Sequence, residues 1–296
     1  MLLFLIGSIV LTSYLTLSFK VCQRFGISTY QAIIFNYITC VITGSFVNGY
    51  FPVTTTNLNT GWFKWAMLMG AMFISIFNLV AYTTHKAGVA VSSVANKLSM
   101  VIPAFFSVWL YNETMGIVKI AGIILALISV VLTSIQENKN EHKTFDWIIP
   151  ILVGSLFISS GLLDTAIKYV EHNFLNENNK NDYLVSAFFF AAVIGIILLS
   201  LQIITGKQKL QGSAVLMGIC IGIPNYFSIW CLVKVLKTPP YNMQSSAIIP
   251  VNNMGIVLFS SVAAFILFRE RLHKINWLGI ALSIIAIALI AYGDKL

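Results

Sequence analysis

The chain has 296 residues, of which 58% are hydrophobic and only 9% are Asp, Glu, Lys or Arg. A typical soluble domain carries roughly 25% charged residues, so a soluble protein of this size could not cover its surface. The mean hydropathy of +0.86 therefore indicates that lipid surrounds most of the chain. The net charge of +8 comes from basic residues scattered singly or in pairs, and without a dense basic patch we expect no nucleic-acid partner.

Apolar segments separated by short polar breaks predict an all-α membrane protein with ten transmembrane helices. The segment 183–204 contains no Asp, Glu, Lys, Arg or His, and about 18 such residues suffice to cross a bilayer core as a helix. Short connections, such as residues 112–114 and the turn around Ala87 and Gly88, predict antiparallel neighbours in one bundle without a soluble domain. The predicted spans are 2–19, 30–49, 63–84, 88–111, 116–135, 147–169, 183–204, 212–236, 243–268 and 275–293.

The chain resembles itself at a shift of 157 residues, which places Gly122 on Gly279 and Asn96 on Asn253 without a gap. Chance agreement between apolar residues inflates such a match, but the paired Gly and Asn positions are harder to explain by chance. The match therefore predicts that the chain is a duplicated five-helix unit.

A second, looser match pairs the Leu-Met-Gly triplets that end at Gly70 and Gly218. The polar stretch 136–146 lies near the middle of the chain, and we expect residues 1–138 and 145–296 to form the two five-helix repeats. Because five is an odd number, the second copy must lie upside down in the membrane. Inverted repeats of this kind recur among transporters, whose binding sites lie near the midplane between the repeats.

An ionisable residue inside a span is costly and is therefore a candidate functional residue. Lys97 lies about nine residues into the fourth span, where insertion scales assign a lysine roughly 2.5–3.5 kcal/mol. We expect Lys97 and its neighbour Asn96 to line a cavity, in which the lysine would attract an anionic group such as a carboxylate or phosphate. A purely structural ion pair or hydrogen bond is the alternative.

Asp164 lies in the sixth span, and Lys168 follows four residues later on the same helix face. A local pair between these two residues near the membrane edge is the simpler interpretation. The other interpretation has Asp164 pointing inward toward Lys97 across the repeat interface. A substrate or a coupling proton could compete for that inward pair.

Asparagine residues within the spans complete the predicted site. Each could instead form an interhelical hydrogen bond worth about 0.6–2 kcal/mol, and we expect that role for Asn36. Asn225 differs because it follows Pro224, whose missing N–H frees a carbonyl one turn earlier. Pro103 offers a similar break in the fourth span. The predicted substrate-binding residues are Lys97, Asn96, Asp164, Asn225, Asn78 and Asn253.

The segment from Phe268 to Ile280 resembles the end of the ninth helix in EamA-like proteins, a family of the drug/metabolite transporter superfamily. In that family a Gly-Glu-Arg-like turn precedes a helix that begins Trp-x-Gly, and here Arg269 replaces the usual Gly. The first half carries a weaker copy around Glu113, with Asn112 in place of the usual Gly and Ile120 in place of the usual Trp.

This resemblance implies ten helices in two inverted five-helix repeats around a central cavity lined mainly by helices 1, 3, 4, 6, 8 and 9. The implied activity is alternating-access transport of a small metabolite or amphiphile across the bacterial cytoplasmic membrane, often as export. We expect a monomer or homodimer that is embedded in the lipid bilayer. Its expected partners are a small-molecule substrate and a proton as candidate coupling ion. The family has both termini in the cytoplasm, whereas the excess of Lys and Arg lies in the loops of the opposite face.

Two other functions compete with transport. An intramembrane enzyme would need clustered catalytic groups, but the four histidines lie at or near span ends and no His-Glu-x-x-His or Gly-x-Ser-x-Gly motif occurs. We therefore expect no catalytic residues, and the separate cysteines predict neither a metal site nor another cofactor. A membrane scaffold or regulatory subunit is the third interpretation, although a scaffold has no need of a charge inside a span.

Overall fold

The computed structural model describes residues 2–103, 106, 116–134, 147–176, 179–237, 245–269 and 272–292, and these residues form helices and their connections without a strand. Every predicted span contains a helix, and the short α3 is an addition that the sequence did not predict. The helices are α1 (Leu2–Arg24), α2 (Thr29–Asn48), α3 (Thr55–Leu58), α4 (Phe63–Ala87), α5 (Val89–Leu98), α7 (Ile117–Ser134), α8 (Ile148–Phe174), α9 (Lys180–Ile204), α10 (Gly212–Lys237), α11 (Ser245–Phe268) and α12 (Lys274–Tyr292).

Seven of the described helices, namely α1, α2, α4, α8, α9, α10 and α11, are long and apolar enough to cross a membrane. Three shorter apolar helices cover Val89–Pro103, Ile120–Thr133 and Lys274–Ile290. The prediction of an all-α protein with several membrane-spanning helices agrees with this architecture. The turns at Glu113 and Glu270 lie outside the described residues, as does most of the segment between the two predicted repeats.

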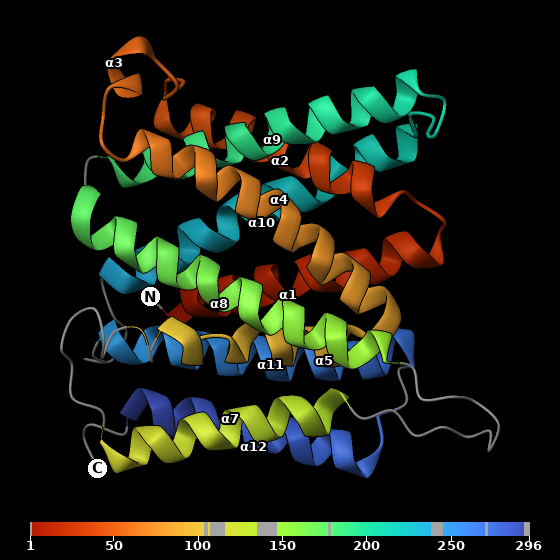
Figure 1. Cartoon of the computed structure of the whole chain (residues 1–296), viewed down its shortest axis with the longest axis vertical. Helices are drawn as coiled ribbons and strands as arrows, with labels where there is room; N and C mark the ends of the chain where they lie inside the picture. The colour runs from red at the N-terminus through yellow and green to blue at the C-terminus, as the bar shows by residue number, and fades with distance from the viewer. Residues whose placement is uncertain are drawn as a thin grey trace.

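The long helices run side by side and alternate in direction, as the colours in Figure 1 allow the reader to follow. Helix α1 begins and α12 ends on the left of that view, and we call this side of the bundle the terminal face. Helix α8 begins on the right, which we call the opposite face, and runs toward the terminal face. The sixth long helix of the chain therefore runs against the first.

The connection between α4 and α5 is a single residue, Gly88, with φ of 96°. An L-residue rarely adopts this backbone conformation, whereas glycine does so without a Cβ clash. The short turn predicted at this point is confirmed, and it makes α4 and α5 antiparallel neighbours.

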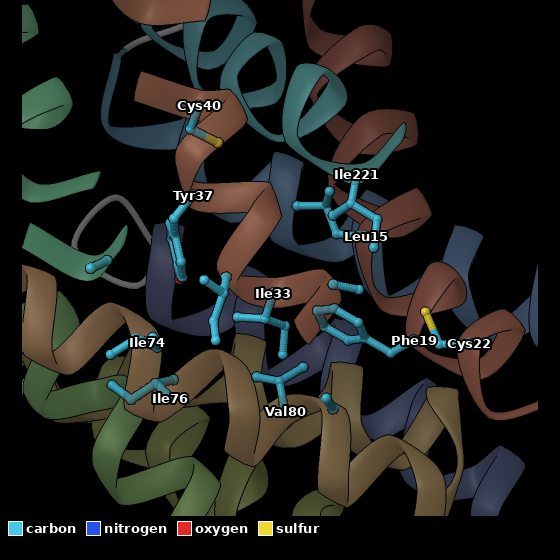
Figure 2. Packing of buried hydrophobic residues seen from close by; sticks show 14 of the residues in the cluster. Leu15, Phe19, Cys22, Ile33, Tyr37, Cys40, Ile74, Ile76, Val80 and Ile221 are labelled. Carbon is cyan, nitrogen blue, oxygen red and sulfur yellow. The ribbon is translucent and has the colours of Figure 1, made fainter. Parts of the chain in front are cut away.

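The largest buried apolar cluster surrounds α2 (Figure 2). Ile33 and Tyr37 of α2 pack with Phe19 of α1, Val80 of α4 and Ile221 of α10. Lipid tails are as apolar as these side chains, so close packing rather than escape from water holds such helices together. Helix α2 is therefore the centre of one half of the bundle, with α4, α9 and α10 around it.

Helices α7 and α12 form a second pair at the far end of the bundle (Figure 1). A Cβ added to Gly122 of α7 would lie 3.0 Å from the backbone nitrogen of Ile290, and one added to Gly279 of α12 would lie 2.9 Å from that of Thr133. The two glycines therefore let these helices approach closely at two crossing points. Any larger residue at either glycine would push the backbones apart.

Candidate functional site

The fourth long helix is interrupted immediately after the residues that the sequence singles out. Helix α5 ends at Leu98, Ser99 and Met100 form a turn, and helical structure resumes at Val101. Pro103 explains the break, because it has no N–H to donate to the carbonyl four residues earlier, which is that of Ser99. The backbone N–H of Ile102 donates instead to this carbonyl, at 2.9 Å.

The break holds Lys97 in the last turn of α5. A cation is favoured there, because the carbonyl groups at a helix C-terminus carry partial negative charge. The side chains of Lys97 and Asn96 are half-buried, and neither makes a hydrogen bond or ion pair with the described part of the chain. Within the described residues, Lys97 is thus a charged group without a direct partner.

Asp164 of α8 faces the break in α5. The hydroxyl oxygen of Ser99 lies 3.5 Å from a carboxylate oxygen of Asp164 and 2.5 Å from the backbone carbonyl oxygen of Asn96. The Asp164 carboxylate and the Lys97 ammonium also attract each other electrostatically, without an ion pair between them. Among the described residues Asp164 forms no ion pair with Lys168, so the simpler of the two sequence interpretations is not the arrangement observed.

The accessible surface of Asp164 lies on the inner side of α8. Successive residues of an α-helix are rotated by about 100°, which places Asp164 about 160–180° from Ser155 and Leu162. Ser155 and Leu162 are exposed on the outer face of α8, yet Asp164 is exposed as well. One turn earlier on the same inner face, Ser160 and Gly161 are both buried. The inner face of α8 therefore becomes accessible from Asp164 onward, toward the terminal face.

Helix α5 changes from buried to accessible at the same level. All residues from Val89 to Ala95 are buried, whereas Asn96, Lys97 and Met100 are half-buried. Helix α5 starts beside the end of α4 at the opposite face, and α8 also starts there (Figure 1). Between the charged residues and the opposite face, α5 and the inner face of α8 are therefore buried, whereas Lys97 and Asp164 themselves are partly accessible.

Hydrogen bonds that the sequence did not predict tie the helices together at the opposite face. The amide nitrogen of Gln31 donates to the Gln208 side-chain oxygen at 3.2 Å and to the Lys209 carbonyl at 2.8 Å. The backbone N–H of Gln211 donates to the side-chain oxygen of Gln31 at 2.9 Å. The backbone N–H of Ser28 donates to the side-chain oxygen of Gln211 at 2.8 Å. We call these four interactions the Gln31 clasp. They join the start of α2 to the connection between α9 and α10.

Asn253 of α11 reaches the same break. Its amide nitrogen lies 3.6 Å from the sulfur of Met100, and its side chain is almost fully buried. The preceding residue, Asn252, has a buried side-chain oxygen without a hydrogen-bond partner among the described residues. Lys97, Asp164 and Asn253 therefore come from three helices that meet at the Ser99–Met100 turn. The proline four residues after Ser99 is the sequence signal that locates this turn.

Two other predicted site residues have different partners. The amide of Asn225 donates to the side-chain oxygen of Asn36 at 3.1 Å, in a fully buried contact between α10 and α2. The amide of Asn78 donates to the backbone carbonyl of Ile74 in its own helix at 2.7 Å. Asn225 thus forms the kind of interhelical hydrogen bond expected for Asn36. Neither Asn225 nor Asn78 contacts Lys97 through a hydrogen bond among the described residues. No group of His, Cys, Asp or Glu among the described residues is arranged to hold a metal ion.

No family model matches the chain. A protein of Haemophilus influenzae, itself uncharacterized, is 25% identical over 300 residues, which cover 99% of this chain and 98% of that protein. A crystal structure of a protein has a similar fold, with a TM-score of 0.63 and 12% sequence identity over 99% of this chain and 96% of that chain. At this identity the likeness concerns the fold alone. The helical bundle formed by the whole chain is therefore one that also occurs in a crystallised protein.

Proposed function

We propose that the protein is a secondary transporter that moves a small metabolite or amphiphile across the bacterial cytoplasmic membrane by alternating access, in the direction of export. The observation that carries this proposal is the Lys97–Asp164 arrangement. Two opposite charges from α5 and α8 lie at a helix break, form no ion pair among the described residues, and are followed toward the opposite face by buried residues. Interior charges next to a broken helix are typical of substrate and ion sites in transporters.

The contacts between helices support two inverted five-helix repeats. If α1, α2, α4, α5 and α7 are exchanged with α8, α9, α10, α11 and α12 in that order, the most extensive contacts map onto one another, although smaller ones such as that of α1 with α4 do not. The contact of α2 with α10 becomes that of α9 with α4, and the contact of α1 with α11 becomes that of α8 with α5. The pairs α7–α12, α5–α11 and α2–α9 map onto themselves. Contacts that exchange in this way are expected between two copies related by a two-fold axis, and they support this proposal.

Individual residues support the same exchange. A Cβ added to Gly70 of α4 would lie 2.8 Å from the carbonyl oxygen of Ala187 in α9, and one added to Gly218 of α10 would lie 2.9 Å from that of Ala32 in α2. Gly70 and Gly218 are the glycines that the looser sequence match pairs. The residues that they approach belong to α9 and α2, which the exchange also pairs.

The same exchange relates the contacts between α7 and α12. Gly122 and Gly279 are 157 residues apart, and so are the residues that they approach, Thr133 and Ile290. Together with the antiparallel order of the helices, this agreement supports ten transmembrane helices divided near residues 138–145. It also supports membership of the EamA-like family, which the turn after α11 suggests.

In the proposed cycle, an anionic group of the substrate enters from the terminal face and binds the Lys97 ammonium. Asp164 releases its attraction to Lys97 when the substrate binds or when it takes up a proton. Rocking of the repeats would then close the site from the terminal face and open the Gln31 clasp. The hydrogen bond from Ser28 to Gln211 is exposed, so water can replace it, whereas the bonds of the buried Gln31 must separate before water can reach them.

A ligand-stability screen tests this function. Purified protein is heated with amino acids, sugars, nucleosides or cationic amphiphiles, because a ligand that binds the folded state raises its stability by mass action. We expect at least one class to raise the melting temperature, and Lys97→Ala to abolish this shift. Lys64→Ala, which removes an exposed lysine at the start of α4, is the matched control and should keep the shift. A shift that is unchanged in Lys97→Ala contradicts the proposed site.

The screen also separates transport from the two other functions. A scaffold or regulatory subunit would respond to none of the small molecules, and Lys97→Ala would then leave flux unaltered because no flux exists. An intramembrane enzyme would convert the ligand that stabilises it, which mass spectrometry of the recovered ligand detects. Flux of unmodified ligand into proteoliposomes supports transport against both.

A further inference from the structure

A second candidate site lies at the opposite face, where α1 and α11 end. It is a pocket of about 710 Å³, a volume within the usual range for ligand pockets. Its position at the ends of two apolar helices is the level at which lipid headgroups meet a membrane protein. The lining residues are Lys20, Gln23, Arg24, Ile266, Leu267, Phe268 and Arg269.

The pocket is basic. Three of its described lining residues are cationic, and none is acidic. The guanidinium groups of Arg24 and Arg269 make no hydrogen bond or ion pair with the described part of the chain, and both residues are exposed. Two guanidinium groups at one pocket can each donate a pair of hydrogen bonds to a phosphate. The chemistry that this pocket fits is therefore an anionic phosphate.

Arg269 has an unusual backbone conformation for this position. It follows Phe268, the last residue of α11, and has φ of 53°, the only positive φ of a non-glycine residue among those described. Helices commonly end with a left-handed residue, which is usually glycine because other residues adopt this conformation at a cost of about 1–2 kcal/mol. An arginine in a backbone conformation that favours glycine indicates a functional role for the arginine side chain at this position.

The pocket also borders the apolar surface of α11. Phe265, Ile266 and Leu267, in the last turn of α11, are 50%, 66% and 59% exposed. Side chains of this kind at the end of a membrane helix contact acyl chains, so an acyl chain beside them would place its headgroup at the level of the two arginines. A free phosphate ion would contact the two arginines alone, whereas a phospholipid would contact both the arginines and the exposed apolar side chains of α11.

We propose that this pocket binds the phosphate headgroup of an anionic phospholipid whose acyl chains lie along the end of α11. Basic pockets between membrane helices are known to accept such headgroups, and each basic residue near the membrane surface contributes to the attraction. The site is separate from Lys97, and it holds a lipid of the surrounding bilayer rather than a transported molecule.

The test uses the full-length protein in detergent and native mass spectrometry. Phosphatidylglycerol, phosphatidylcholine with the same acyl chains, and inorganic phosphate are titrated separately, and lipid retention is measured. We expect phosphatidylglycerol to bind at least about tenfold more tightly than phosphatidylcholine. Equal retention of the two lipids contradicts the site, and binding of inorganic phosphate as tight as that of phosphatidylglycerol shows a free-anion site instead.

Variants place the binding in the pocket. Arg24→Gln combined with Arg269→Gly should weaken phosphatidylglycerol binding by at least about tenfold. Glycine suits the φ of 53° at position 269, so this variant should melt no lower than the wild type, which separates loss of the site from loss of the fold. Lys86→Gln combined with Lys207→Gln removes the same charge from the same face outside the pocket. Equal loss in this control shows that only the overall charge matters, which overturns the proposal.

Discussion

The hydroxyl oxygen of Ser99 lies 3.5 Å from a carboxylate oxygen of Asp164, and this contact joins the broken fourth helix to the inner face of α8. The break itself is caused by Pro103, which cannot donate to the Ser99 carbonyl. In an unbroken helix, Lys97 and the residues of the next turn would continue the buried face formed by Val89 to Ala95. The break instead leaves Lys97 half-buried, close enough to Asp164 for attraction and without a direct partner.

A function for the Lys97–Asp164 arrangement can be separated from a structural role by removing both charges together. We expect Lys97→Met combined with Asp164→Leu to melt near the wild-type temperature, because the two residues form no ion pair whose loss would destabilise the fold. Either single substitution should melt lower than the double variant, since it leaves one charge in the interior. The double variant should nevertheless show no ligand-induced shift and no flux. Wild-type flux in a stable double variant refutes a role for this pair in transport.

Pro103→Ala should restore a hydrogen bond at the break and close the turn at Ser99. A proline inside a helix costs about 3 kcal/mol, part of which neighbouring groups recover in membrane helices. We therefore expect a higher melting temperature together with a large loss of ligand binding. Pro150→Ala is the control, because Pro150 lies in the first turn of α8, where the missing N–H has no intrahelical partner in any case. If Pro103→Ala binds ligand as the wild type does, the break has no part in the site.

The proposed inverted repeats predict equivalent effects at two glycines far apart in the sequence. Gly70→Ala and Gly218→Ala should each lower stability by about 1–3 kcal/mol, because the added methyl group meets backbone atoms of the facing helix. Gly154→Ala is the control, since a Cβ at Gly154 meets nothing within 4 Å and alanine favours the helix. Melting curves of the three variants in one detergent provide the comparison. Strongly different effects at Gly70 and Gly218 would show that the two contacts are not equivalent.

The direction in which the site is accessible can be measured with a membrane-impermeant thiol reagent. In a Cys220→Ser background, which removes the exposed native cysteine, Asn96→Cys should react from the terminal face and not from the opposite face. Val91→Cys lies on the same helix at a buried position and should remain unreactive from both sides. Labelling is read by mass spectrometry of vesicles with known orientation. Reaction of Asn96→Cys from the opposite face alone contradicts the proposed entry of substrate from the terminal face.

Much of the helical framework could be predicted because its cause is local in the sequence. A run of about 20 apolar residues in lipid must satisfy its backbone hydrogen bonds within itself, and only a helix does so. The same local rules locate Lys97 as a costly residue, Gly88 as a turn and Pro103 as a break. The shift of 157 residues is likewise visible in the sequence, since Gly122 and Gly279 are conspicuous among apolar neighbours.

The partners of the polar residues could not be predicted in this way. Asn225 and Asn253 both lie in apolar helices, yet one is engaged by Asn36 and the other reaches the Met100 side chain. Which of the two belongs to a site depends on the rotation of each helix about its axis, and packing against neighbours decides this rotation. Sequence spacing also allowed Asp164 to pair with Lys168, and only the position of α5 beside α8 shows that Ser99 is its hydrogen-bond partner.

The sequence by itself therefore determined that this protein consists of apolar helices in a bundle with charge inside it, because each of these properties follows from residues next to one another. The tertiary structure decided which charges meet and where Arg24 and Arg269 form a pocket. These properties depend on contacts between residues far apart in the chain. Such contacts are set by the closeness with which helices pack at glycines such as Gly70 and Gly218, and no local pattern encodes them.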